Sequence, residues 1–277
     1  MLAGRYRLLQ KAADGERGVL YRAERTDDAR RLAIKLVEPS VHQSREAFEQ
    51  RFRNEVEIAR SLSDRNTLSV LEGGHADEHA MFMASEWPSG IDLARMLTAR
   101  GPRNTRQALF LANQVARSLS AAHDKKIYHG DLSPEGLFVT RDPRGLSLVK
   151  VMDYGRLRIS NFNDEGFSQV DMPVGWARYL APEQITSEEL DGRSDFYALG
   201  CILYRALSGQ LPFRDATGIG ILLSQVHDRA PPLKSHAAAR EVPDAVEAMV
   251  MRCLEKSPSD RFATADELVD LTERLAR

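Results

Sequence analysis

The stretch that decides the fold reads His129-Gly130-Asp131-Leu132-Ser133-Pro134-Glu135-Gly136. It carries two carboxylates, Asp131 and Glu135, and it ends on a glycine, which has no side-chain oxygen. A segment with helical apolar spacing, 105–123, comes before it, and a hairpin-like pair of strands, 137–141 and 146–153, comes after it. What Asp131 does therefore depends on the motifs that stand before and after this loop.

The bulk composition is that of an ordinary globular protein. The chain has 277 residues, 43% of them hydrophobic and 28% charged, with 38 basic and 40 acidic side chains and a formal net charge of -2. This length predicts one large or two small domains, and the hydrophobic content suffices for a core of normal size. The balanced charge argues against a nucleic-acid binder and against a polybasic membrane binder.

Two cysteines, Cys201 and Cys253, both stand in apolar segments with helical spacing. Two cysteines cannot make a disulfide scaffold, so we expect buried reduced thiols and a cytoplasmic location. The chain opens without a signal peptide, and no apolar run reaches the roughly 18 residues that span a bilayer. A membrane anchor after Arg277, in a longer parent protein, stays open.

The first part of the chain is predicted to be β-rich. A helix is expected at 44–62, with Ser44 as its N-cap. Glu55 stands within the apolar stripe of that helix and needs a partner, because an unpaired buried charge is costly. The expected strands are short and separated by Gly/Asp turns; they cover 6–10, 18–25, 31–37, 68–73 and 80–86.

After Pro88 the pattern becomes mostly helical. Helices are expected at 105–123, 194–208, 243–254 and 263–275. The fold class is therefore predicted as α+β with a two-lobed plan. We expect a β-rich N-lobe over 1–88, with a five-stranded sheet and one helix, and a helical C-lobe over 89–277.

Several motifs follow one another along the chain in an order that resembles bacterial eukaryotic-like (Hanks-type) serine/threonine protein kinases. The resemblance covers nearly the whole chain. The stretch Ala13-Asp14-Gly15-Glu16-Arg17-Gly18-Val19-Leu20 is similar to the family's Gly-rich loop, with Ala in the first Gly position. Leu32-Ala33-Ile34-Lys35 is similar to V-A-I-K, the quoted loop to H-R-D-x-x-x-x-N, and Val151-Met152-Asp153-Tyr154-Gly155 to a segment with D-F-G.

The resemblance implies roles for single residues. Lys35 pairs with Glu55 above the nucleotide phosphates, Asp131 accepts the proton of the substrate hydroxyl, and Asp153 holds Mg²⁺. The implied cofactors are ATP and Mg²⁺. The implied ATP contacts are Gly15, Gly18, Leu20, Ala33, Lys35, Glu86, Phe138 and Asp153.

One further segment and two single residues resemble structural features of the family. Ala181-Pro182-Glu183 is similar to A-P-E, Asp195 stands in the position of the family's buried Asp, and Arg261 in that of the Arg that pairs with the A-P-E Glu. These resemblances support the fold and imply nothing about turnover.

Two departures fall inside the quoted loop. Gly136 replaces the metal-binding Asn, so one Mg²⁺ position loses its side-chain oxygen; that Asp153 alone holds one metal stays an alternative. Gly130 replaces the Arg that meets an activation-loop phosphate in the family. The His-Gly-Asp triplet also resembles small-molecule phosphotransferases of the aminoglycoside and choline kinase type, which keep the Asn and lack A-P-E.

Three further departures are Ser133, also inside the loop, and Trp176 and Pro88, outside it. Ser133 replaces a Lys that neutralises the transferring phosphoryl group. Trp176 replaces the Thr that bridges the catalytic Asp and this Lys, and its indole either obstructs Asp131 or turns outward to meet a partner. Pro88, in the hinge segment after Ser85, has no N–H to offer an adenine ring, unless the register shifts by one. The polar segment 156–174 is expected to be an irregular loop.

Phosphoryl transfer depends on positioning and charge stabilisation, so losing several supporting groups multiplies the penalties. We therefore predict a pseudokinase or severely impaired kinase that acts as a signalling scaffold or regulator for partner proteins. Whether it keeps residual ATP binding and whether it forms a homodimer stay open. The alternatives are an active serine/threonine kinase with one Mg²⁺ and a small-molecule phosphotransferase. No nucleic-acid partner is expected.

Overall fold

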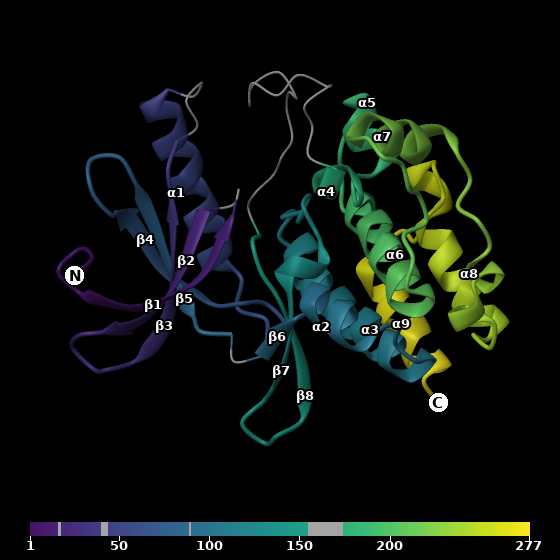
Figure 1. Cartoon of the computed structure of the whole chain (residues 1–277), viewed down its shortest axis with the longest axis horizontal. Helices are drawn as coiled ribbons and strands as arrows, with labels where there is room; N and C mark the ends of the chain where they lie inside the picture. The colour runs from purple at the N-terminus through teal and green to yellow at the C-terminus, as the bar shows by residue number, and fades with distance from the viewer. Residues whose placement is uncertain (16–17, 40–43, 89, 155–173) are drawn as a thin grey trace. The chain divides into compact units, whose positions relative to one another are not determined.

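The computed structural model describes residues 1–15, 18–39, 44–88, 90–154 and 174–277. The chain divides into two compact units, Met1–Ser89 and Gly90–Arg277. The first is β-rich and the second mostly helical, which is the composition of the two lobes of a protein kinase fold (Figure 1).

The first unit is built on one antiparallel sheet in the order β1-β2-β3-β5-β4. Helix α1 covers one face of it (Figure 1). The elements are β1 (Tyr6–Gly15), β2 (Gly18–Arg25), β3 (Arg31–Val37), α1 (Arg45–Ser61), β4 (Val70–His75) and β5 (Met81–Glu86).

The alternation of β3 separates two small cores. Leu32 and Ile34 pack on one face of the sheet with Tyr6 and Phe82. On the other face, Met81 and Met83 of β5 pack against Phe48, Phe52 and Val56 of α1. The predicted N-cap of α1 is confirmed, because the Ser44 hydroxyl accepts the Ala47 N–H at 3.3 Å.

The second unit begins with a small sheet and two helices. Strand β7 lies between β6 and β8, antiparallel to both. The elements are β6 (Gly90–Asp92), α2 (Leu93–Arg100), α3 (Thr105–His123), the 3-10 turn η1 (Pro134–Gly136), β7 (Leu137–Arg141) and β8 (Ser147–Val151).

Helices α3 and α6 form the core of the second unit, where α9 packs on α3 and α8 on α6 (Figure 1). Fourteen of the sixteen residues of α6 are buried, including Asp195 and Cys201. The remaining elements are α4 (Val174–Ala177), α5 (Pro182–Thr186), α6 (Arg193–Ser208), α7 (Gly218–His227), η2 (Leu233–Ser235), η3 (Ala237–Ala239), α8 (Asp244–Cys253), η4 (Pro258–Asp260) and α9 (Ala265–Leu275).

Several predicted boundaries need correction. The strand expected at 146–153 ends at Val151, because Asp153 adopts a left-handed backbone conformation with φ 64° that no strand continues. The strand expected at 6–10 runs on to Gly15, because it pairs with β2 along its whole length. Helix α9 starts at Ala265 and not at 263, because Thr264 caps it.

Both cysteines are free and buried, as expected, and burial raises the pKa of each thiol to about 12. In the described part of the chain, no helix combines the length and the apolar character that crossing a membrane requires.

Candidate functional site: the catalytic-loop frame

One buried carboxylate fixes the backbone of the loop 129–136. Asp195, in the first turn of α6, is 1% exposed. Its Oδ2 accepts the His129 N–H at 2.8 Å, and its Oδ1 accepts the Gly130 N–H at 2.8 Å. The His123 imidazole at the end of α3 bonds the same Oδ2 at 2.8 Å. Asp195 therefore fixes two successive peptide groups of the loop and is itself fixed by a third group.

These contacts also set the charge state of Asp195. Burial alone would raise its pKa, but the hydrogen bond and charge of His123, with the backbone N–H of His129, lower the pKa below the ordinary value. The carboxylate is thus stabilised as an anion inside the second unit.

The side chain of His129 ties the loop to the segment around Asp153. Its Nε2 lies 2.7 Å from the Met152 carbonyl oxygen, and its Nδ1 lies 3.3 Å from the Asp131 N–H. This pattern assigns the proton to Nε2, which donates, and leaves Nδ1 to accept. A backbone bond from the Met152 N–H to the Gly136 carbonyl, at 2.9 Å, closes the other end.

Tyr154 completes this connection. Its ring packs on His129 with centroids 4.8 Å apart, and its hydroxyl lies 2.9 Å from the Ser118 hydroxyl of α3. The Phe of the family motif could not make this bond, so the Tyr here has a structural partner.

Asp131 and Asp153, the two carboxylates predicted to carry the chemistry, are both in the described part and both partly exposed. Asp153 holds φ 64°, a conformation that a non-glycine residue adopts at a cost of roughly 1–3 kcal/mol. Strain of this kind persists where the surrounding contacts enforce it, and here the Met152 carbonyl and the Tyr154 ring fix both neighbours.

Gly136 has an ordinary negative φ and ends η1. An added Cβ would meet only the Met152 carbonyl oxygen, at 3.9 Å, so the position has room for a side chain. Gly130 is different, because it adopts φ 70° and its carbonyl accepts the Gln184 amide at 2.7 Å. Ser133 is 4% exposed, and its extended backbone precedes η1.

The side chains around the loop fit the implied Mg²⁺ only in part. Mg²⁺ requires octahedral oxygen ligands. Gly136 supplies no side-chain oxygen, so the two-ion arrangement does not fit these residues, whereas Asp153 can hold one ion together with phosphate oxygens. No group of three or more His, Cys, Asp or Glu side chains suited to a metal lies among the residues that the structure describes.

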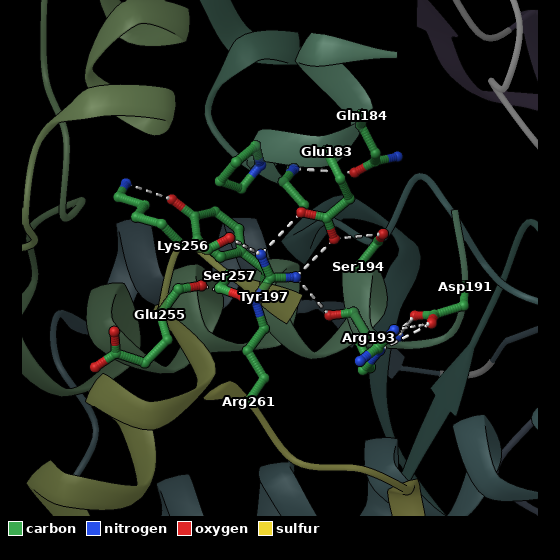
Figure 2. Close-up of polar contacts among 12 residues, drawn as sticks. Glu183, Gln184, Asp191, Arg193, Ser194, Tyr197, Glu255, Lys256, Ser257 and Arg261 are labelled. Atoms are coloured by element: carbon green, nitrogen blue, oxygen red, sulfur yellow. Dashed lines mark hydrogen bonds and ion pairs between the residues drawn. The ribbon is translucent and has the colours of Figure 1, made fainter. Parts of the chain in front are cut away.

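A buried ion pair holds the segment that follows the loop. The Arg261 guanidinium donates to both carboxylate oxygens of Glu183, at 2.6 and 2.8 Å, and Figure 2 shows the two groups facing each other. Their side chains are 0% and 3% exposed. Ser194 donates to Glu183 at 2.7 Å, and the Arg193 carbonyl accepts from Arg261 at 2.9 Å. The pairing expected from the A-P-E resemblance is confirmed.

In the first unit, the predicted Gly-rich turn contains one glycine that no other residue can replace. Gly18 has φ 97°, and a Cβ there would lie 2.2 Å from the Leu36 carbonyl oxygen. Leu20 pairs in register with Lys35, and Ala33, which is 1% exposed, pairs with Ser85. Leu20 and Ala33 therefore belong to neighbouring strands of one sheet.

Lys35 and Glu55 are each partly exposed. Lys35 pairs in register with Met83, which packs against Val56, the residue after Glu55. The strand alternation thus places Lys35 on the face of the sheet that α1 covers. Their ion pair stays a prediction.

Glu86 uses its side chain structurally. Its Oε1 accepts the Ser69 N–H at 2.9 Å, and its own N–H donates to the Ser69 carbonyl at 2.9 Å. The next residue, Trp87, stacks under the Arg22 guanidinium at 5.2 Å. Phe138, in the second unit, pairs in register with Asp92 and Lys150.

Some expectations fall outside the described residues. They concern the polar segment 156–173, Arg17 and Gly155, and also the direction of the Trp176 indole, although the backbone of α4 includes Trp176.

Sequence reasoning missed His123, Gln184 and Ser118. His123 precedes His129 by six residues, and this spacing is the only local signal that could have drawn attention to it.

Comparison with known proteins agrees with this geometry. The sequence profile described as "Protein kinase domain" matches residues 6–271. Serine/threonine-protein kinase pkn3 of Myxococcus xanthus is 32% identical over 96% of this chain, which covers 49% of that protein. Serine/threonine-protein kinase PknH of Mycobacterium tuberculosis is 32% identical over 96% of this chain and 41% of its own length. The chain therefore spans less than half of these relatives.

Solved structures show the same fold. A variant of the PknI kinase domain of Mycobacterium tuberculosis matches with a TM-score of 0.74 and 23% identity, over 100% of this chain and 97% of that one.

Proposed function

The chain belongs to the protein kinase domain family, among bacterial Hanks-type serine/threonine kinases, and from that premise we propose that it is a pseudokinase or severely impaired kinase. Its role would be that of a signalling scaffold or regulator that binds partner proteins. The observation that carries this proposal is Gly136, which stands where the family has its metal-binding Asn and has no side-chain oxygen.

Two further positions support the proposal. Gly130 has no guanidinium, and its φ of 70° means that an Arg placed there would add backbone strain of roughly 1 kcal/mol or more. Ser133 presents a small hydroxyl where the family has a cation. Each lost charge-stabilising group costs on the order of tenfold in rate, so the losses together leave little phosphoryl transfer.

An active kinase with one Mg²⁺ is the second candidate, and the conformation of Asp153 favours it. A strained φ of 64° at a carboxylate is typical of functional sites. For this candidate Asp131 accepts the hydroxyl proton, and Lys35 with Glu55 positions the phosphates. The small-molecule phosphotransferase is weaker, because the Glu183–Arg261 pair holds an A-P-E segment that those enzymes lack.

We keep ATP as the proposed ligand. In the first unit its contacts would be Gly15, Gly18, Leu20, Ala33, Lys35 and Glu86, and in the second unit Phe138 and Asp153, with Mg²⁺ on Asp153. A thermal shift with ATP that requires Mg²⁺ and is lost in Lys35→Ala would support residual binding, and no shift would remove nucleotide sensing from the proposal.

The decisive experiment restores the missing ligand. Incorporation of phosphate from radiolabelled Mg²⁺-ATP into the protein itself and into a general kinase substrate is compared for wild type, Gly136→Asn, Gly136→Ala and Asp131→Asn. A Cβ at Gly136 meets no atom closer than 3.9 Å, so Gly136→Ala controls for the added Cβ and for backbone stiffness.

We expect wild type and Gly136→Ala to match Asp131→Asn at background. Gly136→Asn should rise about tenfold or more if the absent oxygen is the main defect. Robust incorporation by wild type that Asp131→Asn abolishes would overturn the pseudokinase proposal and establish the one-metal kinase.

A further inference from the structure

Arg205, near the end of α6, lies beside the segment that leads into Ala181-Pro182-Glu183. Its Nη1 donates to the Tyr179 hydroxyl at 2.9 Å, while the side chain stays partly exposed. Tyr179 itself is 7% exposed. A guanidinium is thus anchored on a buried phenol and accessible from solvent.

This guanidinium lacks the partner that a half-buried cation normally has. Arginine offers five N–H donors, and within the described part of the chain Arg205 uses one of them, on a neutral oxygen, and forms no ion pair. Two other arginines of the same unit do have carboxylates, since Arg193 pairs with Asp191 and Arg261 with Glu183. The carboxylate missing at Arg205 can come from another molecule.

The surroundings of Tyr179 connect this position to the catalytic loop. Burial raises the pKa of Tyr179, to about 12, against the charge and hydrogen bond of Arg205, and the charge of Glu135 in the loop acts in the same direction as burial. Gln184 joins the two segments, because it donates to the Gly130 carbonyl at 2.7 Å and accepts the Ala181 N–H at 3.0 Å.

A second arginine of this segment supports the same conclusion. Arg178, the neighbour of Tyr179, has a buried Nε without a hydrogen-bond acceptor in the described structure, and no described carboxylate pairs with it. Its carbonyl accepts the Gln225 amide at 2.9 Å, so its backbone is fixed. Two guanidinium groups with unused N–H donors therefore belong to this segment, that of Arg178 directly and that of Arg205 through its bond to Tyr179.

We infer that Arg205 is a specificity position that binds a carboxylate side chain in an acidic segment of a protein partner. This inference rests on the proposed role in binding partner proteins. Charge complementarity commits it to an acidic peptide, because a carboxylate can take two parallel N–H bonds from a guanidinium. Glu135 is an exposed carboxylate whose charge acts on Tyr179, the partner of Arg205, so it should repel an incoming carboxylate.

The test measures peptide binding to the whole chain by fluorescence anisotropy. The probes are three pools of fluorescein-labelled short peptides, degenerate except for a fixed central pair that is Glu-Glu, Gln-Gln or Lys-Lys. The proteins are wild type, Arg205→Gln, Arg205→Glu, Glu135→Gln and Arg240→Glu. Arg240 is exposed and precedes α8, so its reversal changes net charge equally without touching Tyr179.

We expect wild type to bind the Glu-Glu pool about tenfold more tightly than the Gln-Gln pool. Arg205→Gln, which replaces the guanidinium with a neutral amide, should abolish that preference, and Arg205→Glu should shift it to the Lys-Lys pool. Glu135→Gln should strengthen Glu-Glu binding by roughly twofold to threefold. Arg240→Glu should behave as wild type. A thermal melt confirms that each variant is folded.

A preference for Glu-Glu that survives in Arg205→Gln, equal binding of all pools by wild type, or a wild-type preference for Lys-Lys would each overturn the inference. Failure of the proposed function has a different readout. If wild type transfers phosphate to Ser- or Thr-containing acidic peptides, the pseudokinase proposal fails, and Arg205 stands as a substrate-specificity position of an active kinase.

Discussion

This chain keeps the residues that support the backbone of the loop 129–136, but it has replaced residues of the loop that would contact a ligand. Asp195, itself bonded by His123, and Gln184 hold the loop backbone with bonds of 2.7 to 2.8 Å. Glu183 with Arg261 holds the segment after it. At Gly130, Ser133 and Gly136, in contrast, the side chains that serve phosphoryl transfer in the family are gone. The two sets are neighbours in sequence and space.

The difference has a physical reason. A buried charge that loses its partner destabilises the fold by several kcal/mol. The residues that support the loop therefore cannot be substituted one at a time without a loss of stability. Gly136 has no side chain that packs, and an added Cβ would meet only the Met152 carbonyl oxygen, at 3.9 Å. Residues of the second kind can change while the fold is kept, and this separates evidence for the fold from evidence for catalysis.

Glu183→Gln should have the largest effect on stability. It leaves the Arg261 guanidinium buried at 0% exposure beside a neutral amide, so we expect a loss of about 3–5 kcal/mol in the free energy of unfolding. Urea denaturation followed by circular dichroism measures it. The matched control is Glu273→Gln, whose partner Arg117 is 46% exposed and which should cost less than about 1 kcal/mol. Equal losses would erase the distinction between supports and surface.

Asp195→Asn should cost about 3 kcal/mol at pH 7, because an amide cannot accept from both backbone N–H groups and His123 together. The cost should depend on pH. The pKa of Asp195 is lowered in the folded state, so its stabilisation is complete above the ordinary aspartate pKa of about 3.9 and is lost as the pH falls through the folded value.

Urea titrations of wild type and Asp195→Asn from pH 7 down to pH 3 should therefore converge toward low pH. A gap that stays constant over this range would mean that the carboxylate charge contributes nothing and that the shape of the residue alone matters.

Whether a feature could be predicted from the sequence depends on whether it rests on a local pattern or on a contact between distant residues. Helix α3 was predicted with both its ends, 105–123, because its apolar spacing is a local signal. The Glu183–Arg261 pair was reachable because two separate motifs each name one partner. The bond between His123 and Asp195 joins residues 72 apart, and no local pattern announces it.

Helix α7 shows another limit. Its sequence GIGILLSQVH has two glycines and a continuous apolar run, and such a run carries no readable helical period. The Thr217 cap, which accepts the Gly220 N–H at 3.1 Å, was the available signal. Helix α2, with eight residues, was missed in the same way and is capped by Asp92.

Gly192→Ala sharpens the contrast between the two sets of groups at glycine positions. A Cβ at Gly192 would lie 2.5 Å from the His123 ring, which its bond to Asp195 keeps from moving away. We expect a loss of about 1–3 kcal/mol. Gly136→Ala should be neutral or slightly stabilising, because its Cβ would lie 3.9 Å from the Met152 carbonyl oxygen and because alanine restricts the unfolded chain. Thermal denaturation of both variants checks this, and a neutral Gly192→Ala would show that His123 is not fixed.

Tyr154→Phe should have the smallest effect, and it tests whether the Tyr was selected as a support. It restores the Phe of the family motif and removes one bond, 2.9 Å between the Tyr154 and Ser118 hydroxyls. The ring packing on His129 stays, so the loss should be about 1 kcal/mol. The double variant with Ser118→Ala should cost less than the sum of the single losses, because each single variant already breaks the same hydroxyl–hydroxyl bond. Strictly additive losses of stability would show that the two hydroxyls do not stabilise each other. Tyr154 would then belong with the replaced residues of the loop and not with the residues that support it.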